Sequence, residues 1–320
     1  MELDLNKKKI LVTGGAGFVG SNLVQTLKRD YDVEVTVLDD LFSGNASYLA
    51  NIDCELVRGS VEDKDLVDSL IKGKDIVFHL AARNIIVSNK NPREDLNVNV
   101  VGSFNVLDSC LKNNIERLVY TSTSSIYGNT AQLPIHETDT KSFLSFYSAS
   151  KYSAEVYAKA FNEVFELPVS VVRYSNVFGY NQSPLNPYCG VIGKFINSAL
   201  SNESIKIHGD GEQTRDFTFI DDAVNATIGA AVSSKAIGNE YNVGTGVEVS
   251  INKLAESIIN ICESKSVIEH IDKRDIDNIR RRVVSIERAR HDLRFSPMTT
   301  LNQGLIKTIE WYKLNFNKKV

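Results

Sequence analysis

Tyr147 and Lys151 are the two side chains of this sequence best suited to proton transfer. They stand four residues apart in YSASK at residues 147–151, so a helix would place them one turn apart on the same face. A tyrosine hydroxyl has an ordinary pKa of about 10, and a neighbouring ammonium favours its ionised form. Tyr147 is therefore our candidate for an acid or base near neutral pH. An isolated pair of this kind is more often an ordinary surface pair, so the prediction depends on the motifs around it.

A glycine-rich segment near the amino terminus has the pattern of a phosphate-binding turn. Thr13–Gly20 reads TGGAGFVG and lies between an apolar run and a helical pattern. Gly14 would permit a tight turn, Gly17 would let the backbone approach a pyrophosphate, and Gly20 would let the helix pack closely. The amino end of that helix would offer unpaired N–H groups to phosphate oxygens. An isolated match is sometimes an ordinary turn, but the place of this one after a first strand predicts a dinucleotide site.

Asp39 indicates which dinucleotide is bound. It ends the apolar run VEVTVLDD, about twenty residues after Gly20, where a carboxylate can accept hydrogen bonds from the ribose hydroxyls of adenosine. A carboxylate there would repel a 2′-phosphate, so NAD is favoured over NADP. The alternative for Asp39 is a solvated acid in the turn DDLFSG. If NAD is bound, the positive charge of its nicotinamide adds to that of Lys151 in lowering the pKa of Tyr147.

Six short apolar runs in the first half of the chain alternate with helical patterns, which predicts parallel strands joined by crossover helices. The sequence therefore predicts an α/β fold with a Rossmann-type doubly wound parallel sheet. We expect this NAD-binding domain over residues 1–172, with returning segments at about 216–260, and a smaller, mostly C-terminal α/β substrate domain over residues 173–320. A short strand is expected near Ile205–His208. The six runs are Ile10–Val12, Val33–Leu38, Cys54–Val57, Ile76–Leu80, Leu118–Ser122 and Val169–Arg173.

The composition of the 320 residues narrows the classes of protein to consider. A hydrophobic content of 42% is enough for a substantial core. A formal net charge of −4 gives no general attraction to nucleic acid or to an anionic membrane surface, so neither is an expected partner. The four cysteines are scattered without paired spacing, and no metal site is expected. The amino terminus lacks a signal-peptide pattern, and no run of about eighteen apolar residues occurs. We therefore expect a cytoplasmic protein.

Six motifs in a fixed order produce a resemblance to a known family. Besides TGGAGFVG and YSASK, the chain contains FHLAA, TSTSSIYG, RYSNVFG and GDGEQTRDFTFIDD, at residues 78–82, 121–128, 173–179 and 209–222. From about residue 9 to about residue 310, the chain resembles the extended short-chain dehydrogenase/reductases, and within them the nucleotide-sugar 4-epimerases of UDP-glucose and UDP-N-acetylglucosamine. The resemblance implies an NAD-dependent isomerase that epimerises a UDP-hexose, N-acetylhexosamine or uronate at C4 through a 4-keto sugar. Relatives commonly serve polysaccharide biosynthesis.

The resemblance also implies roles for individual residues. Tyr147 would remove the proton of the sugar 4-hydroxyl with the support of Lys151, and Thr123 would hydrogen-bond that hydroxyl. Arginine suits the substrate diphosphate because its planar fork can bond phosphate oxygens in pairs. The implied cofactor residues are Gly14, Gly17, Phe18, Val19, Asp39, Ser43, Gly44, Ser60, Val61, Leu80, Ala81, Ala82, Asn99, Tyr147, Lys151 and Tyr174. The implied substrate residues are Asn84, Thr123, Asn176, Val191, Arg215, Arg274 and Arg282.

Three departures from the family pattern affect the implied site. Ser60 stands where relatives have an aspartate that contacts adenine, so the adenine contact is altered. Ser175 and Phe178 replace the residues of RYFNVYG and change the expected floor of the sugar site. Near the carboxyl end, Arg274 or one of residues 280–282 would hold a phosphate, and in the simplest register Arg282 shapes the sugar pocket and suits a carboxylate. An exposed basic loop explains this run equally well.

Other activities of the same family are alternatives. Relatives that dehydrate or decarboxylate their substrate carry acidic residues after the catalytic Ser or Thr, whereas this chain has Ser124 and Ser125. Asp39 argues against a reductase of the common NADPH-using form. A non-catalytic NAD-binding module is a further alternative because a fold does not determine chemistry, and the intact catalytic residues argue against it.

The resemblance implies a homodimer, formed through the helix of Tyr147 and the preceding helix at about residues 92–110. The apolar side chains of Val98, Val101 and Leu107 on that preceding helix could equally pack inside one subunit. The sequence by itself leaves both arrangements open.

Overall fold

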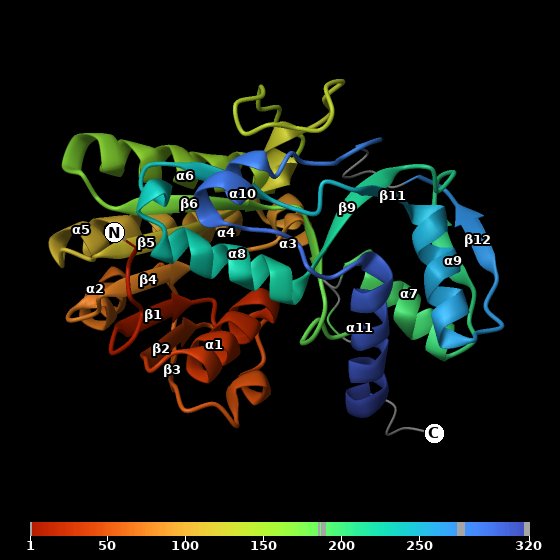
Figure 1. The fold of residues 1–320 in the computed structure, drawn as a ribbon, viewed down its shortest axis with the longest axis horizontal. Helices are drawn as coiled ribbons and strands as arrows, with labels where there is room; N and C mark the ends of the chain where they lie inside the picture. The colour runs from red at the N-terminus through yellow and green to blue at the C-terminus, as the bar shows by residue number, and fades with distance from the viewer. Residues whose placement is uncertain (1, 185, 187–189, 274–278, 317–320) are drawn as a thin grey trace.

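A computed structural model describes residues 2–184, 186, 190–273 and 279–316 of the chain. They form two lobes that lie side by side, a larger one at the left of Figure 1 and a smaller one at the right. The chain passes into the smaller lobe after β6 and again after β10, at the carboxyl ends of two adjacent strands of the large sheet. This edge of the sheet therefore faces the boundary between the lobes.

The larger lobe is built on a seven-stranded sheet in the order β10-β6-β5-β4-β1-β2-β3. All neighbouring strands are parallel, as the alternation of apolar runs and helical patterns predicts. The strand order reverses between β1 and β4, and sheets of this kind bind ligands outside the carboxyl ends of the strands at that point. The strands are β1 (Lys9–Thr13), β2 (Glu34–Asp39), β3 (Glu55–Arg58), β4 (Ile76–His79), β5 (Arg117–Thr123), β6 (Val169–Tyr174) and β10 (Glu240–Val243).

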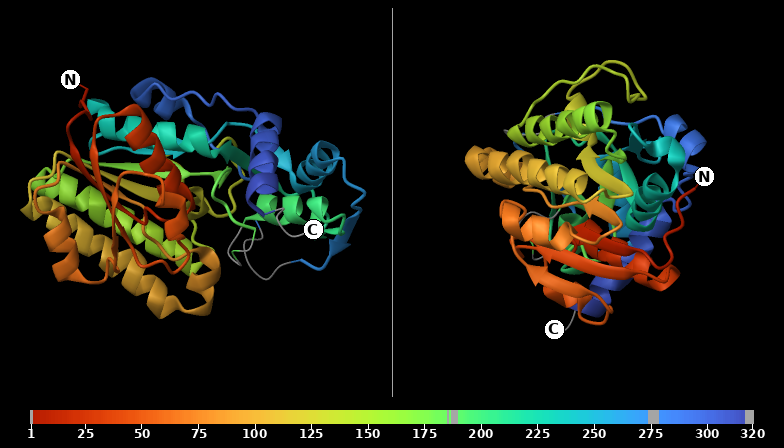
Figure 2. Two further views of the ribbon diagram at one scale, coloured as in Figure 1. Left: turned by 90° about the horizontal axis from the view of Figure 1, so that it is seen from below. Right: turned by 90° about the vertical axis from the view of Figure 1, so that its left-hand side faces the viewer.

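Helices cover both faces of this sheet (Figure 2). On one face α1 (Phe18–Asp30), α8 (Ile220–Val232) and α10 (Glu287–Leu293) share a core that extends into the smaller lobe. On the other face α2 (Lys64–Ile71), α5 (Ser103–Lys112) and α6 (Phe146–Phe165) enclose a second core. Short helices complete the lobe: η1 (Ala46–Leu49), α3 (Ile85–Lys90), α4 (Pro92–Asp95), η3 (Ser124–Tyr127), η4 (Ser234–Ala236) and the π-helix η2 (Leu96–Gly102).

In the described part of the chain, the smaller lobe contains two short sheets and three helices. One sheet has the order β11-β9-β7 and the other pairs β12 with β8. Apolar residues of α7, α9 and α11 pack onto these strands and join the larger of the two cores. The elements are β7 (Asn176–Phe178), α7 (Val191–Leu200), β8 (Ile205–His208), β9 (Thr214–Phe219), β11 (Glu248–Ser250), α9 (Ile251–Cys262), β12 (Ile268–Ile271) and α11 (Leu301–Phe316).

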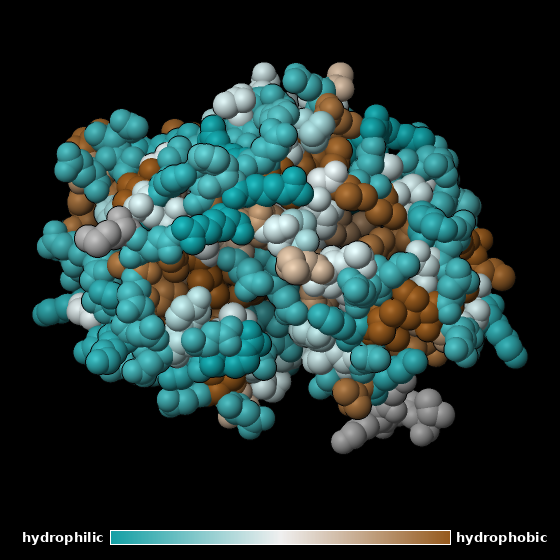
Figure 3. Space-filling view, in the orientation of Figure 1, coloured by the Kyte–Doolittle hydropathy of each residue, from teal (hydrophilic) through white to brown (hydrophobic). Residues whose placement is uncertain are grey.

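The doubly wound parallel sheet expected from the sequence is confirmed, and each of the six apolar runs is a strand of it. The return to the large lobe, expected over residues 216–260, is made by α8 and β10, whereas α9 packs against α7 and β8 in the smaller lobe. The face seen in Figure 3 is mainly hydrophilic, with hydrophobic residues in separate patches. Within the described ranges no helix is long and apolar enough to cross a membrane.

Candidate active site

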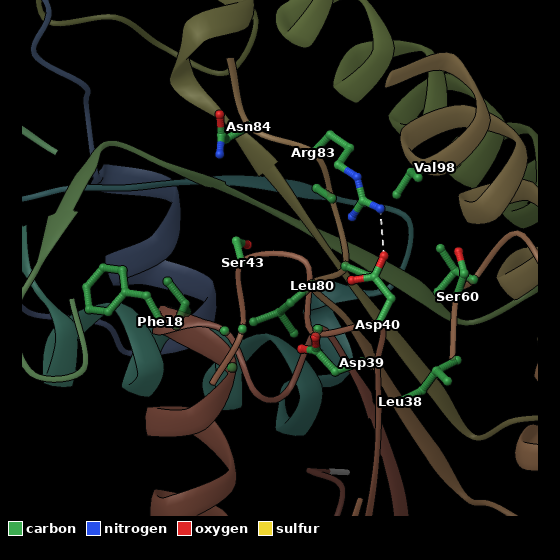
Figure 4. A pocket seen from close by; sticks show the side chains of 18 of the residues that line it. Phe18, Leu38, Asp39, Asp40, Ser43, Ser60, Leu80, Arg83, Asn84 and Val98 are labelled. Carbon is green, nitrogen blue, oxygen red and sulfur yellow. Dashed lines mark hydrogen bonds and ion pairs between the residues drawn. The ribbon is translucent and has the colours of Figure 1, made fainter. Parts of the chain in front are cut away.

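A pocket of about 330 Å³ lies at the carboxyl ends of β1, β2 and β4, where the strand order reverses. Its wall is formed by the turns that follow β1 to β4 and by the first turn of α6 (Figure 4). The structure brings most of the sequence-predicted cofactor residues together here. The predicted residues that line it are Gly14, Gly17, Phe18, Val19, Asp39, Ser43, Gly44, Ser60, Val61, Leu80, Ala81, Ala82, Asn84 and Tyr147.

The glycine turn after β1 has the geometry that a bound pyrophosphate requires. Gly14 has a φ of +71°, and a Cβ there would lie 2.7 Å from the backbone nitrogen of Ala81, so only glycine fits. At Gly17 a Cβ would meet only the carbonyl of Gly14, at 3.1 Å. Gly17 is therefore open toward the pocket, and it is the amino-terminal cap of α1. A dinucleotide phosphate fits against this cradle because the first N–H groups of a helix have no partner within the helix.

Asp39 lies at the end of β2 with its carboxylate in the pocket wall (Figure 4). Its two carboxylate oxygens accept hydrogen bonds from the backbone N–H groups of Ala16 at 2.9 Å and Leu41 at 2.8 Å. Burial raises the pKa of Asp39, and these two hydrogen bonds act in the opposite direction. Each carboxylate oxygen has a second lone pair that could accept a ribose hydroxyl. The geometry thus fits the adenosine end of the expected cofactor.

Of the catalytic residues expected from the sequence, Tyr147 lines the pocket, and Thr123 and Lys151 lie outside its lining. Ser145 begins α6 with a capping box, which fixes the first turn that contains Tyr147. The hydroxyl of Thr123, at the end of β5, is hydrogen-bonded to Tyr147. Lys151 lies one turn further along α6, and its ammonium is 4.4 Å from the ring centroid of Tyr120. The lysine is 2% exposed, so it lies behind Tyr147 rather than on the pocket surface.

The pKa values of this pair differ from the sequence-based expectation. Burial raises the pKa of Tyr147 to about 12, while the hydrogen bond with Thr123 lowers it. Burial also lowers the pKa of Lys151 to about 7, although nearby carboxylates raise it. The expected lowering of the Tyr147 pKa by Lys151 is therefore wrong for the protein chain alone. Removing water from the phenolate disfavours the ionised form of Tyr147. The amine of Lys151, with its lowered pKa, also carries less positive charge near neutral pH than an exposed lysine does.

Two buried carboxylates that the sequence gave no reason to single out lie behind the catalytic pair. Asp95 is 3% exposed and accepts hydrogen bonds from Ser88 at 2.5 Å, Asn99 at 2.7 Å and Ser150 at 2.9 Å. Glu155 is on α6, one turn after Lys151, and is 1% exposed. Both carboxylates attract the ammonium of Lys151 and raise its pKa against the effect of burial. They therefore help to keep a positive charge beside Tyr147.

Asn99 and Tyr174 do not line the pocket, although both were expected to flank the cofactor. The amide of Asn99 is fully buried, and it accepts a hydrogen bond from the backbone N–H of Arg83 and donates one to the carbonyl of the same residue. The hydroxyl of Tyr174 is 2.6 Å from that of Thr227. Asn99 thus braces the loop that forms the pocket wall. Asn84 lines the pocket, and its side chain caps α3.

The substrate residues expected from the sequence lie mainly in the smaller lobe. Asn176 is in β7 and Arg215 is in the neighbouring strand β9. Arg215 is 7% exposed and donates to the carbonyls of Thr214 and Ile279, both at 2.8 Å. These contacts attach residues 279–284, which include the buried Arg282, to β9. Val191 is the first residue of α7, and Arg274 lies outside the described residues.

The structure also locates the departures from the family pattern. Ser60 lines the pocket. The hydroxyls of Ser175 and Thr218 are 2.6 Å apart, so this pair occupies the position expected for an aromatic ring. Phe178 is 1% exposed and packs against Phe219, which makes it part of the core. Among the described residues no cluster of His, Cys, Asp and Glu could hold a metal ion.

Sequence reasoning missed two charged groups in the pocket wall, Arg83 and Asp40. Arg83 follows the LAA motif and lines the pocket together with Asp40, with which it forms an ion pair (Figure 4). A charged residue directly after a motif that approaches the cofactor was a signal that could have singled it out. Its partners, at residues 40 and 94, are separated from it in sequence, so only the fold shows the contact.

Comparisons with known proteins identify the family of this chain. The profile of the NAD dependent epimerase/dehydratase family matches residues 10–244. The UDP-glucose 4-epimerase of Mycolicibacterium smegmatis is 34% identical, covering 95% of this chain and 98% of that protein. The UDP-N-acetyl-alpha-D-glucosaminuronate decarboxylase of Bacillus cytotoxicus is 33% identical, covering 96% and 98%. The solved structure of the UDP-N-acetylglucosamine 4-epimerase of Methanobrevibacter ruminantium M1, in complex with UDP-N-acetylmuramic acid, has a TM-score of 0.90 at 34% identity, covering 96% of this chain and 98% of that chain.

Proposed function

Because this chain belongs to the NAD-dependent epimerase/dehydratase family, we propose that it epimerises a nucleotide-diphosphate sugar at C4 through a 4-keto intermediate. The substrate class is a UDP-hexose, a UDP-N-acetylhexosamine or a UDP-uronate. The observation that supports this most strongly is the contact between Thr123 and Tyr147 at the wall of a pocket that fits NAD. Tyrosine and threonine hydroxyls at this point can move a proton on and off one sugar hydroxyl.

Bound NAD supplies the redox chemistry, by taking a hydride from C4 of the sugar and giving one back. Tyr147 removes the proton of the 4-hydroxyl during oxidation and returns a proton to the 4-keto oxygen during reduction. Thr123 holds the same oxygen and stabilises the phenolate by its hydrogen bond to Tyr147. Lys151 supports that phenolate when it is protonated. Arg215, Asn176 and the neighbouring segment hold the diphosphate while the keto sugar turns to present its other face.

The residues that follow Thr123 favour epimerisation over elimination. Ser124 and Ser125 begin the 3₁₀ helix η3, and the backbone N–H of Ser125 donates to the hydroxyl of Thr123. Neither serine can serve as the second acid or base that loss of water from the sugar requires. The similarity to a decarboxylase makes the reaction type the first point to measure.

The test is an NMR assay of purified protein, without added cofactor, on UDP-glucose, UDP-N-acetylglucosamine, UDP-glucuronate and UDP-N-acetylglucosaminuronate. We expect interconversion of C4 epimers of at least one sugar. A preference for the uronates would support a role for the buried Arg282 in binding the carboxylate. Loss of water or carbon dioxide, or a need for added NAD(P)H, would contradict epimerisation.

Replacing Thr123 with alanine is expected to shift the pH dependence of turnover. The hydrogen bond from Thr123 lowers the pKa of Tyr147, so its loss raises that pKa. Because the phenolate is the base, turnover rises with pH through this pKa, and the rising limb should move to higher pH. At pH 7 we expect kcat to fall about 10- to 100-fold, which corresponds to a hydrogen bond to a charged group of about 1.5–3 kcal/mol. Thr123→Ser should keep the wild-type profile, and an unshifted limb in Thr123→Ala would refute the role of Thr123.

We also propose that the protein is a homodimer. Large apolar side chains of η2, α5 and α6 are solvent-exposed in the single chain: Val101 by 47%, Phe104 by 41%, Tyr157 by 46%, Val164 by 67% and Phe165 by 55%. Phe104 and Tyr157 pack edge to face across the two helices, so the apolar surface is continuous between them. Exposed apolar patches of this kind mark association surfaces.

Sedimentation of the wild-type chain should give a dimer, and Phe104→Glu should give a monomer because it places a charge in the centre of this surface. The matched control is Leu314→Glu on α11, which is 76% exposed and distant in sequence from both helices. It should leave the mass unchanged. A monomeric wild-type protein, or a dimer that survives Phe104→Glu, would contradict this interface.

A further inference from the structure

A three-residue ion-pair cluster joins two loops of the cofactor pocket. Nη2 of Arg83, in the loop after β4, is 2.6 Å from Oδ2 of Asp40, in the loop after β2. Nε of the same guanidinium is 2.6 Å from Oε1 of Glu94 on α4. Figure 4 shows Arg83 reaching from its own loop to Asp40, with Ser43 and Ser60 of the pocket wall to either side.

The cluster is shielded enough for its charges to interact strongly. The side chain of Arg83 is 11% exposed, and those of Asp40 and Glu94 are 27% and 28% exposed. Burial lowers the pKa of Arg83, but its hydrogen bonds to the two carboxylates outweigh this effect and raise it. The guanidinium carbon also lies 4.2 Å from the ring centroid of Phe42. Arg83 therefore contacts the loop after β2 at two residues, Asp40 and Phe42.

Hydrogen bonds fix both the backbone of Arg83 and the far end of the loop after β2. The backbone N–H of Arg83 donates to Asn99 at 2.7 Å, and the amide of Asn99 donates back to the carbonyl of Arg83 at 3.1 Å. The far end of the loop after β2 is held by the N–H of Asn45, which donates to the carbonyl of Ala16 at 2.9 Å. Between these anchors, Arg83 contacts residues 40–44 through the side chains of Asp40 and Phe42, in addition to the hydrogen bonds of Leu41 with Asp39 and of the Ser43 carbonyl with Asn186. Ser43 and Gly44 of this stretch line the pocket directly.

We propose that Arg83 is a latch that holds residues 40–44 against the pocket and slows the dissociation of NAD. Opening the loop requires the charge-assisted hydrogen bond to Asp40 and the cation–π contact with Phe42 to be given up together, while Glu94 holds the guanidinium in place. Charge-assisted hydrogen bonds are stronger than neutral ones. The role of Arg83 goes beyond the proposed reaction, and its benefit to the enzyme rests on that reaction. An enzyme that must return the same electrons to its substrate cannot release its reduced cofactor in mid-cycle.

The test measures release of NAD in the absence of any sugar, so its result is independent of the substrate and of the reaction catalysed. Wild-type protein and the variants Arg83→Met, Asp40→Asn and Glu94→Gln are loaded with NAD, passed through a desalting column and diluted. The NAD that remains on the protein is extracted and quantified over time. Methionine keeps an apolar stem in place of the arginine stem, and the two amides keep the volume of the carboxylates, so these variants remove charge with little loss of packing.

We expect Arg83→Met to release NAD at least about tenfold faster than the wild-type protein, a factor that corresponds to about 1.4 kcal/mol. Asp40→Asn should accelerate release in the same sense, and the double variant Arg83→Met/Asp40→Asn should be no faster than Arg83→Met alone, since both remove one interaction. The matched control is Lys8→Met, which removes a similar ion pair with Glu116 at the opposite, amino end of β1. It should leave the release rate unchanged.

Two results would contradict the proposed role of Arg83. The first is an unchanged release rate in Arg83→Met. The second is fast release in Arg83→Met with wild-type rates in both Asp40→Asn and Glu94→Gln, which would mean that Arg83 binds the cofactor directly. Thermal melting of each variant after removal of NAD serves as the fold control. Faster release with an unchanged melting temperature assigns the effect to the loop rather than to general destabilisation.

Discussion

Tyr147→Phe is expected to lower kcat for the preferred nucleotide sugar by about 10²- to 10⁴-fold, the range that a positioned general base or acid contributes. The substitution removes one hydroxyl and leaves the ring that lines the pocket, so binding of cofactor and substrate should change little. The lost oxygen is the one that is hydrogen-bonded to Thr123 and receives the sugar proton. Turnover followed by NMR, together with extraction of bound NAD, separates the loss of chemistry from a loss of cofactor.

Tyr152→Phe provides the matched control, because it makes the same substitution on the same helix. Tyr152 packs against Phe143, with ring centroids 5.2 Å apart, and does not line the pocket. Its removal should leave kcat within about threefold of the wild-type value, a change of about 0.65 kcal/mol. Undiminished turnover in Tyr147→Phe would refute the assignment of the base. Loss of NAD from that variant would show that the hydroxyl of Tyr147 helps to hold the cofactor as well.

The parts of the candidate site whose positions can be predicted from the sequence are those that a short, continuous segment determines. The turn from β1 to α1 needs a glycine at residue 14 for its backbone angle, so the glycine pattern predicts both the turn and its phosphate cradle. Asp39 ends the next strand and therefore lies at the same edge of a parallel sheet. Helical periodicity places Tyr147 and Lys151 on one face of α6.

The properties that the sequence could not predict arise from burial and from contacts between distant segments. Spacing alone suggested a lowered pKa for Tyr147, but burial of its hydroxyl raises that pKa. Arg83 and Asp40 are 43 residues apart, and Asp95 and Ser150 are 55 residues apart. Only the order of strands in the sheet brings such residues together. The apolar pattern of α9 is compatible with packing in either lobe. Only its contacts with α7 show that it belongs to the smaller one.

A buried ion pair supports the catalytic helix from behind. Glu155 lies one turn after Lys151, and its carboxylate pairs with the guanidinium of Arg173 in β6, both side chains being 1% exposed. Arg173 also donates to the hydroxyl of Tyr127 at 2.8 Å and to the carbonyl of Glu137 at 2.9 Å. The pair therefore joins α6 to the sheet and to the segment that follows η3. It satisfies two charges that could not remain buried separately.

Arg173→Met is expected to lower the free energy of unfolding by about 3–5 kcal/mol, the cost of removing one partner from a buried ion pair. Glu155 would remain in the core without its counter-charge, and the bonds to Tyr127 and Glu137 would be lost. Urea unfolding followed by circular dichroism measures the change. Arg29→Met is the control, because Arg29 and its partner Asp30 are 66% and 44% exposed. An exposed pair of this kind contributes about 0–1 kcal/mol.

The double variant Glu155→Leu/Arg173→Met distinguishes an unpaired charge from lost packing. It removes both charges of this pair from the core, and apolar replacements of a buried pair are often neutral or stabilising. We therefore expect it to be more stable than Arg173→Met alone, with a coupling energy of about 2 kcal/mol or more between the two sites. A double variant as unstable as the sum of the two single variants would contradict the ion-pair explanation. The loss in Arg173→Met would then come from its bonds to Tyr127 and Glu137, and the charge of Glu155 would serve Lys151 rather than the stability of the fold.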